Sequence, residues 1–352
     1  MIRILVLALL PFAAQADPLR VASFNTELQR DGPGLMLRDI RKETPQVRAV
    51  VDVLRATAPD VVALQGLDWD HDNVALSALA DLLAAAGLDY PYRFARQPNS
   101  GLMTDLDLDG DGRLGGPGDA QGWGRFTGNG GIAVLSRYPI IEDQIADHSA
   151  LLWKDLPGAM LPGRDGAPFP SEQAQSVQRL SSTAHWVVPI DTPQGRLTLM
   201  TFHATPPVFD GPEDRNGLRN RDEIRFWSVL LRGDLGPAPT RRFVIAGDAN
   251  LDPARGEGHT EALRALLTNP LLQDPRPTDA TGADTTVTWK TVGDRRVDYV
   301  LPSADWVVED AGVFWTGADG QPHPAARAAS RHRLVWVDLT GAGAQDRPAG
   351  TD

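Results

Sequence analysis

The sequence contains no cysteine, which excludes disulfide bonds and cysteine-ligated zinc sites. It also has no uninterrupted apolar run of about twenty residues, the length that a transmembrane helix needs. Positive charge is scarce, because 34 Lys and Arg stand against 46 Asp and Glu and the formal net charge is −12. Tight binding to duplex nucleic acid depends on many contacts between basic side chains and phosphates. This charge balance therefore disfavours long duplexes as partners.

The first sixteen residues have the pattern of a secretory signal peptide. Arg3 precedes an apolar run over residues 4–12, and Ala14-Gln15-Ala16 follows as a small-x-small cleavage signature. We therefore expect a signal peptide over residues 1–16 and a mature chain that begins near Asp17. This pattern predicts a periplasmic or secreted protein with no stable insertion in the membrane.

We expect residues 17–340 to form a single domain. The chain is 42% hydrophobic, which is enough for a sizeable core, and α/β enzymes of this length often fold as one unit. No repeat of fixed period is present, which disfavours a solenoid or a coiled coil. Residues 341–352 are rich in Gly, Ala and Asp and predict a flexible tail. No obligate protein partner is indicated.

Strands and helices are expected to alternate along the chain, from short apolar segments and from apolar residues at helical spacing. The expected strands are 19–25, 61–65, 131–135, 196–203, 242–246, 296–301, 306–314 and 334–339. The expected helices are 45–57, 76–86, 218–231 and 260–267. Two irregular segments, 96–130 and 154–178, are long enough to predict functional or disordered loops. Two strand-rich halves with helices between them fit two sheets packed face to face, with the helices outside.

Polar residues stand at or near the ends of several of these strands, where loops can bring them to one edge. They are Asn25, His203, Asp248, Asn250, Asp298 and His332. Any one of them alone has an ordinary explanation as a turn or capping residue. Together they indicate a functional site.

Six segments carry a resemblance to a known family. They are 23–25, 59–65, 131–140, 247–250, 296–301 and 330–333, that is SFN, PDVVALQ, GIAVLSRYPI, GDAN, RVDYVL and SRHR. In this order and spacing, most of residues 19–340 resembles the endonuclease/exonuclease/phosphatase family. The resemblance implies an α/β fold, a four-layered α/β/β/α sandwich of two packed, mostly antiparallel sheets. It also implies a hydrolase, a nuclease or phosphodiesterase, that cleaves a phosphate ester in a cleft at the strand ends, and the signal-peptide pattern predicts that this hydrolase is exported.

The resemblance also implies roles for individual residues. Asp248 would orient or deprotonate the attacking water, and Asn250 and Asn25 would hold the phosphate or that carboxylate. His332 would lie near the scissile phosphate, oriented by Asp298. His203 would make a second contact with the phosphate or the leaving group. These roles agree with in-line displacement at phosphorus, which needs a positioned nucleophile and donors that stabilise charge on the equatorial oxygens.

Two positions depart from the family's pattern. After Leu64-Gln65 the family normally has a metal-binding glutamate, but this chain has Gly66. Before the final histidine the family normally has an aspartate, but this chain has Arg331. Mg²⁺ or Mn²⁺ would be the expected cofactor, yet Mg²⁺ is usually held by at least one or two carboxylates. The two departures put that divalent cation in doubt.

Three explanations are open. Glu27, with Asp68 or Asp70, would rebuild a metal site, or the Arg331 guanidinium would supply the positive charge in place of a metal. In the third, the chain is a non-catalytic relative that binds phosphate esters without cleaving them. The ester itself, whether nucleic acid, lipid head group or sugar phosphate, is left open.

A second candidate metal site lies in the first long loop. Asp107, Asp109 and Asp111 alternate with other residues and are followed by Gly112, as in the first part of a calcium-binding loop. Position twelve of that frame is Gly118 instead of glutamate, and Asp119 follows it. We therefore expect either Ca²⁺ in residues 107–119 or a solvated acidic loop.

Overall fold

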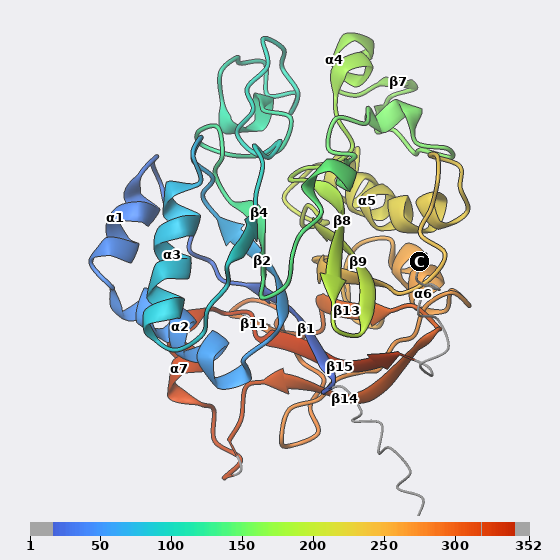
Figure 1. Cartoon of the computed structure of the whole chain (residues 1–352). Coiled ribbons are helices and arrows are strands. Elements are labelled where there is room, and N and C mark those ends of the chain that lie inside the picture. The colour runs from blue at the N-terminus through green and yellow to red at the C-terminus, as the bar shows by residue number, and fades with distance from the viewer. Residues whose placement is uncertain (1–16, 318, 342–352) are drawn as a thin grey trace, which may run out of the picture.

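Two β-sheets lie face to face, with helices on both outer sides, in the computed structural model, which describes residues 17–317 and 319–341 (Figure 1). The predicted signal peptide and all of the predicted tail beyond Gly341 lie outside these described residues. The four layers confirm the predicted α/β/β/α arrangement.

The first sheet has six strands in the order β14-β15-β1-β2-β4-β3. Their bounds are Trp306–Phe314 for β14, Leu334–Gly341 for β15, Leu19–Asn25 for β1, Val61–Leu67 for β2, Gly131–Ser136 for β4 and Tyr92–Phe94 for β3. Only β1 and β2 run parallel within this sheet. Their carboxyl ends therefore meet at one edge, where Asn25 pairs with Gln65.

The second sheet has five strands in the order β13-β10-β9-β8-β5. Their bounds are Asp298–Pro302 for β13, Phe243–Asp248 for β10, Gly195–His203 for β9, His185–Thr192 for β8 and Ala146–Asp147 for β5. Here β9 and β10 are parallel and the other pairs are antiparallel. Both sheets are thus mixed but mostly antiparallel, as predicted.

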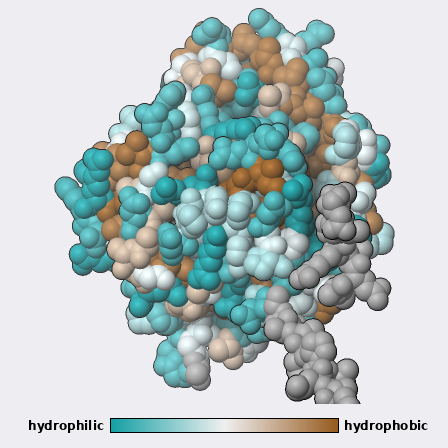
Figure 2. Space-filling model, in the orientation of Figure 1, coloured by the Kyte–Doolittle hydropathy of each residue, from teal (hydrophilic) through white to brown (hydrophobic). Residues whose placement is uncertain are grey.

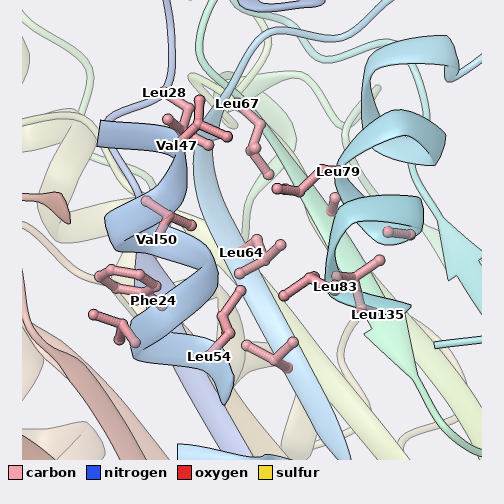
Figure 3. Packing of buried hydrophobic residues seen from close by; sticks show 14 of the residues in the cluster. Phe24, Leu28, Val47, Val50, Leu54, Leu64, Leu67, Leu79, Leu83 and Leu135 are labelled. Carbon is pink, nitrogen blue, oxygen red and sulfur yellow. The ribbon is translucent and has the colours of Figure 1, made fainter. Parts of the chain in front are cut away.

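Three apolar clusters hold the layers together. The helices α1 (Leu35–Arg41), α2 (Pro45–Thr57), α3 (Val74–Ala85) and α7 (Pro324–Ala329) pack on the outer face of the first sheet. Figure 3 shows Val50 and Leu54 of α2 against Leu64 of β2, with Leu83 of α3 on the other side. The helices α5 (Arg215–Leu231) and α6 (Thr260–Leu267) cover the second sheet. The third cluster fills the space between the sheets.

The shorter elements belong to the connections. They are α4 (Glu172–Val177), the hairpin of β6 (Gly163–Arg164) and β7 (Ala167–Pro168), the hairpin of β11 (Val287–Trp289) and β12 (Gly293–Arg295), and three 3₁₀ turns, Pro117–Asp119, Glu142–Gln144 and Trp153–Asp155. The loops 96–130 and 154–178 rise above the sheets in Figure 1 and carry defined hydrogen bonds, such as Asn99 N to Thr183 O at 2.8 Å.

The pattern of apolar residues did not predict β8, β3 or α1. Pro189 lies inside β8, and proline is normally excluded from a central strand because it has no N–H to donate. Strand β9 pairs with β8 along its whole length, Pro189 included, but on the other side β5 pairs with β8 only at Trp186 and Val187, so that edge of β8 has no partner strand beside Pro189. The proline carbonyl instead accepts a hydrogen bond from Ile141 N at 2.9 Å.

Hydrophilic side chains dominate most of the surface in Figure 2, with hydrophobic ones gathered mainly on the upper loops. The large exposed apolar side chains include Trp123, Leu114 and Phe209, all in connecting segments. None of the helices described is long and apolar enough to cross a membrane.

Candidate active site

Strand register places the central polar residues beside one another. Asp248 ends β10, which pairs in parallel with β9 so that Asp248 lies opposite His203. On its other side β10 pairs with β13, and there Asp248 lies opposite Asp298. Partners directly opposite in a ladder have Cβ atoms about 5 Å apart. The second sheet therefore contributes an imidazole and two carboxylates to one edge.

Asn25 connects the first sheet to this edge. Its Nδ2 donates a hydrogen bond of 2.9 Å to Oδ2 of Asp248, although 223 residues separate the two. Oδ1 of Asp248 accepts another from the backbone N–H of Asn250 at 2.7 Å. Asn250 adopts a left-handed conformation with φ of 50°, which asparagine tolerates better than most residues. Both oxygens of Asp248 are thus fixed in direction.

Asp248 is fully buried, and this changes its acidity. Burial raises the pKa of Asp248, and the neighbouring Asp298 carboxylate raises it further, because two buried negative charges repel each other. A carboxylate with a raised pKa is a better proton acceptor than an ordinary aspartate.

His332 lies just before β15, and its position completes the group. Its Nδ1 donates to the Asp298 carboxylate, at 3.0 Å to Oδ2 and 3.2 Å to Oδ1, and lies 3.7 Å from Oδ2 of Asp248. Burial alone would lower the pKa of His332, but the charges of Asp298 and Asp248 outweigh it and raise the pKa to about 9. His332 is therefore an imidazolium at neutral pH. The predicted orientation of His332 by Asp298 matches this geometry.

His203 has a different environment. Its Nε2 lies 3.5 Å from Oδ2 of Asp248, and its buried Nδ1 has no partner among the described residues. Burial lowers the pKa of His203, the attraction of the Asp248 carboxylate opposes this only in part, and the positive charge of His332 lowers the pKa further. His203 is therefore neutral, beside a charged His332.

A metal ion has one candidate place at this edge. Asp248, Asp298 and His332 each offer a ligand atom, all within 4.8 Å of one another, and this buried group could bind a metal ion. Its mixed nitrogen and oxygen donors suit a transition metal better than Mg²⁺, which prefers oxygen. The proton on His332 already supplies positive charge between the two carboxylates, and a metal bound through Nδ1 would have to displace it.

The carboxylates predicted to rebuild a metal site lie apart from this group and have other partners. Asp68 accepts hydrogen bonds from Arg30 N at 2.8 Å, and from Asn129 Nδ2 and Gly130 N at 3.0 Å each. Asp70 caps α3, where its oxygens accept hydrogen bonds of 2.6 and 2.8 Å from the first two backbone N–H groups of the helix. The structure thus places both aspartates in structural roles.

Glu27 and Arg331 form an ion pair with each other. Oε2 of Glu27 accepts from the backbone N–H of Arg331 at 2.8 Å and from Ser330 Oγ at 3.1 Å, and Oε1 accepts from Arg331 Nε at 2.7 Å. A guanidinium nitrogen of Arg331 also contacts Oε1. Burial alone would raise the pKa of Glu27, but its hydrogen bonds from Arg331 outweigh burial and lower the pKa.

Ser330 and Asn220 are two polar residues to which the sequence assigned no role. Ser330 Oγ donates to Asn25 O at 2.8 Å and accepts from His332 N at 3.0 Å, so it joins β1 to the His332 segment. Asn220 is buried within α5, and its Nδ2 donates to Thr205 O at 2.7 Å and Ala249 O at 2.8 Å. Buried polar residues in a helix that faces an apolar cluster are a signal that could have identified Asn220.

An aromatic side chain stands against His332. The Trp289 ring, on the β11–β12 hairpin, meets the His332 ring edge-on with centroids 6.1 Å apart. The hairpin is attached to the same segment, because Thr288 N donates to Arg331 O at 3.3 Å. The hairpin forms one wall beside the imidazolium.

The acidic loop brings together a different set of aspartates from the one predicted. Asp107, Asp109 and Asp119 offer carboxylate oxygens within 4.8 Å of one another, whereas Asp111 is not part of this group. Asp111 instead accepts a hydrogen bond of 2.7 Å from Arg113 N. A side chain at position 118 would collide with Asp109, since a Cβ there would lie 1.8 Å from Oδ2 of Asp109. Asp119, the next residue, supplies the third carboxylate of this group.

Residues 22–332 match the model of the Endonuclease/Exonuclease/phosphatase family. No curated protein sequence matches the chain. A similar solved structure is the endonuclease/exonuclease/phosphatase from Beutenbergia cavernae, with 21% identity, a TM-score of 0.58, and coverage of 94% of this chain and 73% of that one.

Two further structures are similar at lower identity. The family protein from Leptotrichia buccalis has 13% identity and a TM-score of 0.51, over 91% of this chain and 99% of that one. The beta toxin from Staphylococcus aureus, solved with bound magnesium ions, has 14% identity and a TM-score of 0.51, over 91% of this chain and 99% of that one. At these identities the likeness shows a shared fold.

Proposed function

The chain belongs to the endonuclease/exonuclease/phosphatase family, and from that premise we propose that it hydrolyses a phosphodiester by attack of water at phosphorus. The observation that carries the proposal is the buried charge arrangement of Asp248, Asp298 and His332. Burying two carboxylates around one imidazolium has a large desolvation cost, and perturbed pKa values such as those of Asp248 and His332 are common at functional sites.

In the proposed reaction, Asp248 orients a water molecule and accepts one of its protons. The water oxygen forms a bond to phosphorus while the bond from phosphorus to the leaving oxygen breaks on the opposite side, and the leaving oxygen takes a proton from solvent. The products are a phosphomonoester and an alcohol. The raised pKa of Asp248 favours this proton transfer.

His332 stabilises the charge that develops on the phosphate. Its Nδ1 is bound to Asp298, which leaves the hydrogen on Nε2 for a phosphate oxygen. Because Asp298 fixes the ring in advance, little reorganisation is needed when negative charge grows on the equatorial oxygens. The neutral His203, beside Asp248, is a second polar contact for the phosphate or the leaving group.

The alternative from a different class is a protein that binds phosphate esters without cleaving them. A direct test is the release of nitrophenolate from bis(p-nitrophenyl) phosphate by the purified protein. We expect saturable turnover, faster than on the monoester p-nitrophenyl phosphate, because a monoanionic diester meets less repulsion from the buried carboxylates. Saturable binding of the diester without any turnover would overturn the enzyme and support the binding protein.

We further propose that the natural ester is a small or single-stranded one, exposed outside the cytoplasm. Support comes from the net charge of −12 and from the signal-peptide pattern of residues 1–16. Nucleic acid, lipid head groups and sugar phosphates share the diester chemistry that the cleft would bind.

Calcium in the 107–119 loop stays a prediction, now with Asp119 among the candidate ligands. Burial raises the pKa of Asp109, and the nearby carboxylates of Asp111 and Asp119 add to this effect. A cation would relieve this repulsion, so Ca²⁺ is expected to raise Tm over that in chelator, and Asp119→Asn to remove the increase. Thermal unfolding of both proteins with and without Ca²⁺ measures this. Identical Tm values for the unsubstituted protein would contradict a calcium site.

A further inference from the structure

The Glu27–Arg331 ion pair lies near the group of Asp248, Asp298 and His332, and the proposed reaction does not yet use it. Glu27 lies two residues after the end of β1, with a left-handed φ of 49°, an uncommon conformation for a non-glycine residue. Its side chain is mostly buried at 15% exposure, whereas that of Arg331 is 60% exposed. Arg331 directly precedes His332 in the chain, and its ion-pair partner Glu27 is close enough to His332 that the charge of each affects the pKa of the other. The structure thus holds a cation, fixed from one side, next to His332.

Free oxygen ligands for Mg²⁺ are missing around the Glu27–Arg331 ion pair. Gly66 has a left-handed φ of +69°, and a Cβ there would lie 2.5 Å from Oδ1 of Asn25, so no carboxylate can project from position 66 without rearrangement. The Glu27 carboxylate is occupied by Arg331 and Ser330, and Asp68 is occupied by three N–H donors. Mg²⁺ usually needs one or two carboxylates free to coordinate it. The residues at positions 27, 66 and 68 therefore do not fit that ion.

The charge of the ion pair matches what a metal centre would provide. Two carboxylates with a divalent cation carry no net charge, and neither does Glu27 with Arg331. A guanidinium also offers five N–H donors in a planar fork that suits phosphate oxygens. Nε and one further nitrogen are directed at Glu27, and no acceptor for Nη1 is found among the described residues. Nη1 is therefore available to a ligand.

We propose that Arg331, held in place by Glu27, binds the substrate phosphate in the role of a divalent cation, so that the cleft needs no metal. The proposal rests on the phosphodiester function proposed above, and it names the side chain that binds the phosphate at this site. Arg331 supplies hydrogen bonds and charge to the non-bridging oxygens, and Glu27 keeps the guanidinium from turning away into solvent.

The test measures both turnover and binding of bis(p-nitrophenyl) phosphate in the presence of EDTA. For the unsubstituted protein, kcat/KM in EDTA should stay within about twofold of its value in Mg²⁺ or Mn²⁺. Arg331→Ala should weaken diester binding about ten- to a hundredfold, as expected for the loss of charge-assisted hydrogen bonds. Glu27→Gln should weaken binding less, because the guanidinium remains but is no longer held by an opposite charge.

Arg196→Ala is the matched control. Arg196 also forms an exposed pair with a carboxylate, Asp191, but at the turn between β8 and β9, at the far end of β9 from His203. This variant should bind and turn over the diester as the unsubstituted protein does.

Several outcomes would overturn the proposal. Loss of diester binding or turnover in EDTA, restored by Mg²⁺ or Mn²⁺, would show that a metal holds the phosphate. Arg331→Ala with unchanged affinity would show that Arg331 does not. If no protein turns over any ester, the hydrolase function fails separately, because equilibrium binding of the diester in EDTA still tests Arg331.

Discussion

Asp248→Asn is expected to lower kcat for diester hydrolysis by about 10²- to 10⁴-fold, the usual effect of removing a general base. The carboxamide can neither accept the proton of the attacking water nor keep both hydrogen bonds that orient the side chain. Its NH₂ group would face either Nδ2 of Asn25 or the N–H of Asn250, which are both donors. Steady-state kinetics of the purified variant measure the effect.

Stability should not fall in parallel with activity in this variant. Because burial and Asp298 raise the pKa of Asp248, the ionised carboxylate is already unfavourable in the folded protein, and a neutral amide removes that repulsion. The relief of this repulsion offsets the cost of the donor–donor contact that the amide introduces, so Tm is expected to change little. The control is Asp60→Asn, a half-buried carboxyl group with a raised pKa at the opposite end of β2, which should leave kcat unchanged. An Asp248→Asn protein with near-normal kcat would contradict the assignment.

His332→Gln is expected to reduce both rate and stability. The loss of the imidazolium removes the charge that stabilises the transition state, at a cost of about 10²- to 10³-fold in kcat. It also leaves Asp248 and Asp298 buried without a cation, and breaking a buried ion pair costs about 3–5 kcal/mol. Kinetics together with urea unfolding near pH 6 measure the two losses.

The stability difference should depend on pH in a defined direction. The folded-state pKa of His332 is about 9, which is above the ordinary value of about 6.5 in the unfolded chain. Its stabilising contribution, about 3 kcal/mol from this shift, is therefore complete below pH 6.5 and lost as pH rises through about 9. The difference in the free energy of unfolding between the unsubstituted protein and His332→Gln should therefore decrease as pH rises over that range. A difference that grows with pH would contradict the assignment of a stabilising charge to His332. So would the same pH dependence in the exposed control His71→Gln.

The fold was predictable because apolar patterning is a local property. The strands that end in Asn25, His203 and Asp248 are rich in apolar residues, and the rule that polar strand ends meet at one edge was sufficient to group them with Asp298 and His332. Strand β8 was not predictable in this way, because Pro189 argues against a strand at this position. Only the pairing of β8 with β5 and β9 explains why the proline is tolerated.

The partners of isolated carboxylates were not predictable. Glu27 and Arg331 are 304 residues apart, and no local pattern indicates that one neutralises the other. Asp68 was predicted as a metal ligand because it follows β2 closely in the sequence. Its carboxylate instead accepts hydrogen bonds from the backbone N–H groups of Arg30 and Gly130. Asp119 belongs with Asp107 and Asp109 only because the loop folds back on itself. Such contacts depend on loop conformation, which residue types alone do not determine.

The central claim, that this cleft directs water onto a phosphodiester, is tested most directly by hydrolysis in oxygen-18-labelled water with mass spectrometry of the products. We predict one labelled oxygen in the phosphomonoester and none in the alcohol, with labelled product formed about 10²- to 10⁴-fold more slowly by Asp248→Asn. Label in the alcohol, or no labelled product from the unsubstituted protein, would contradict the claim.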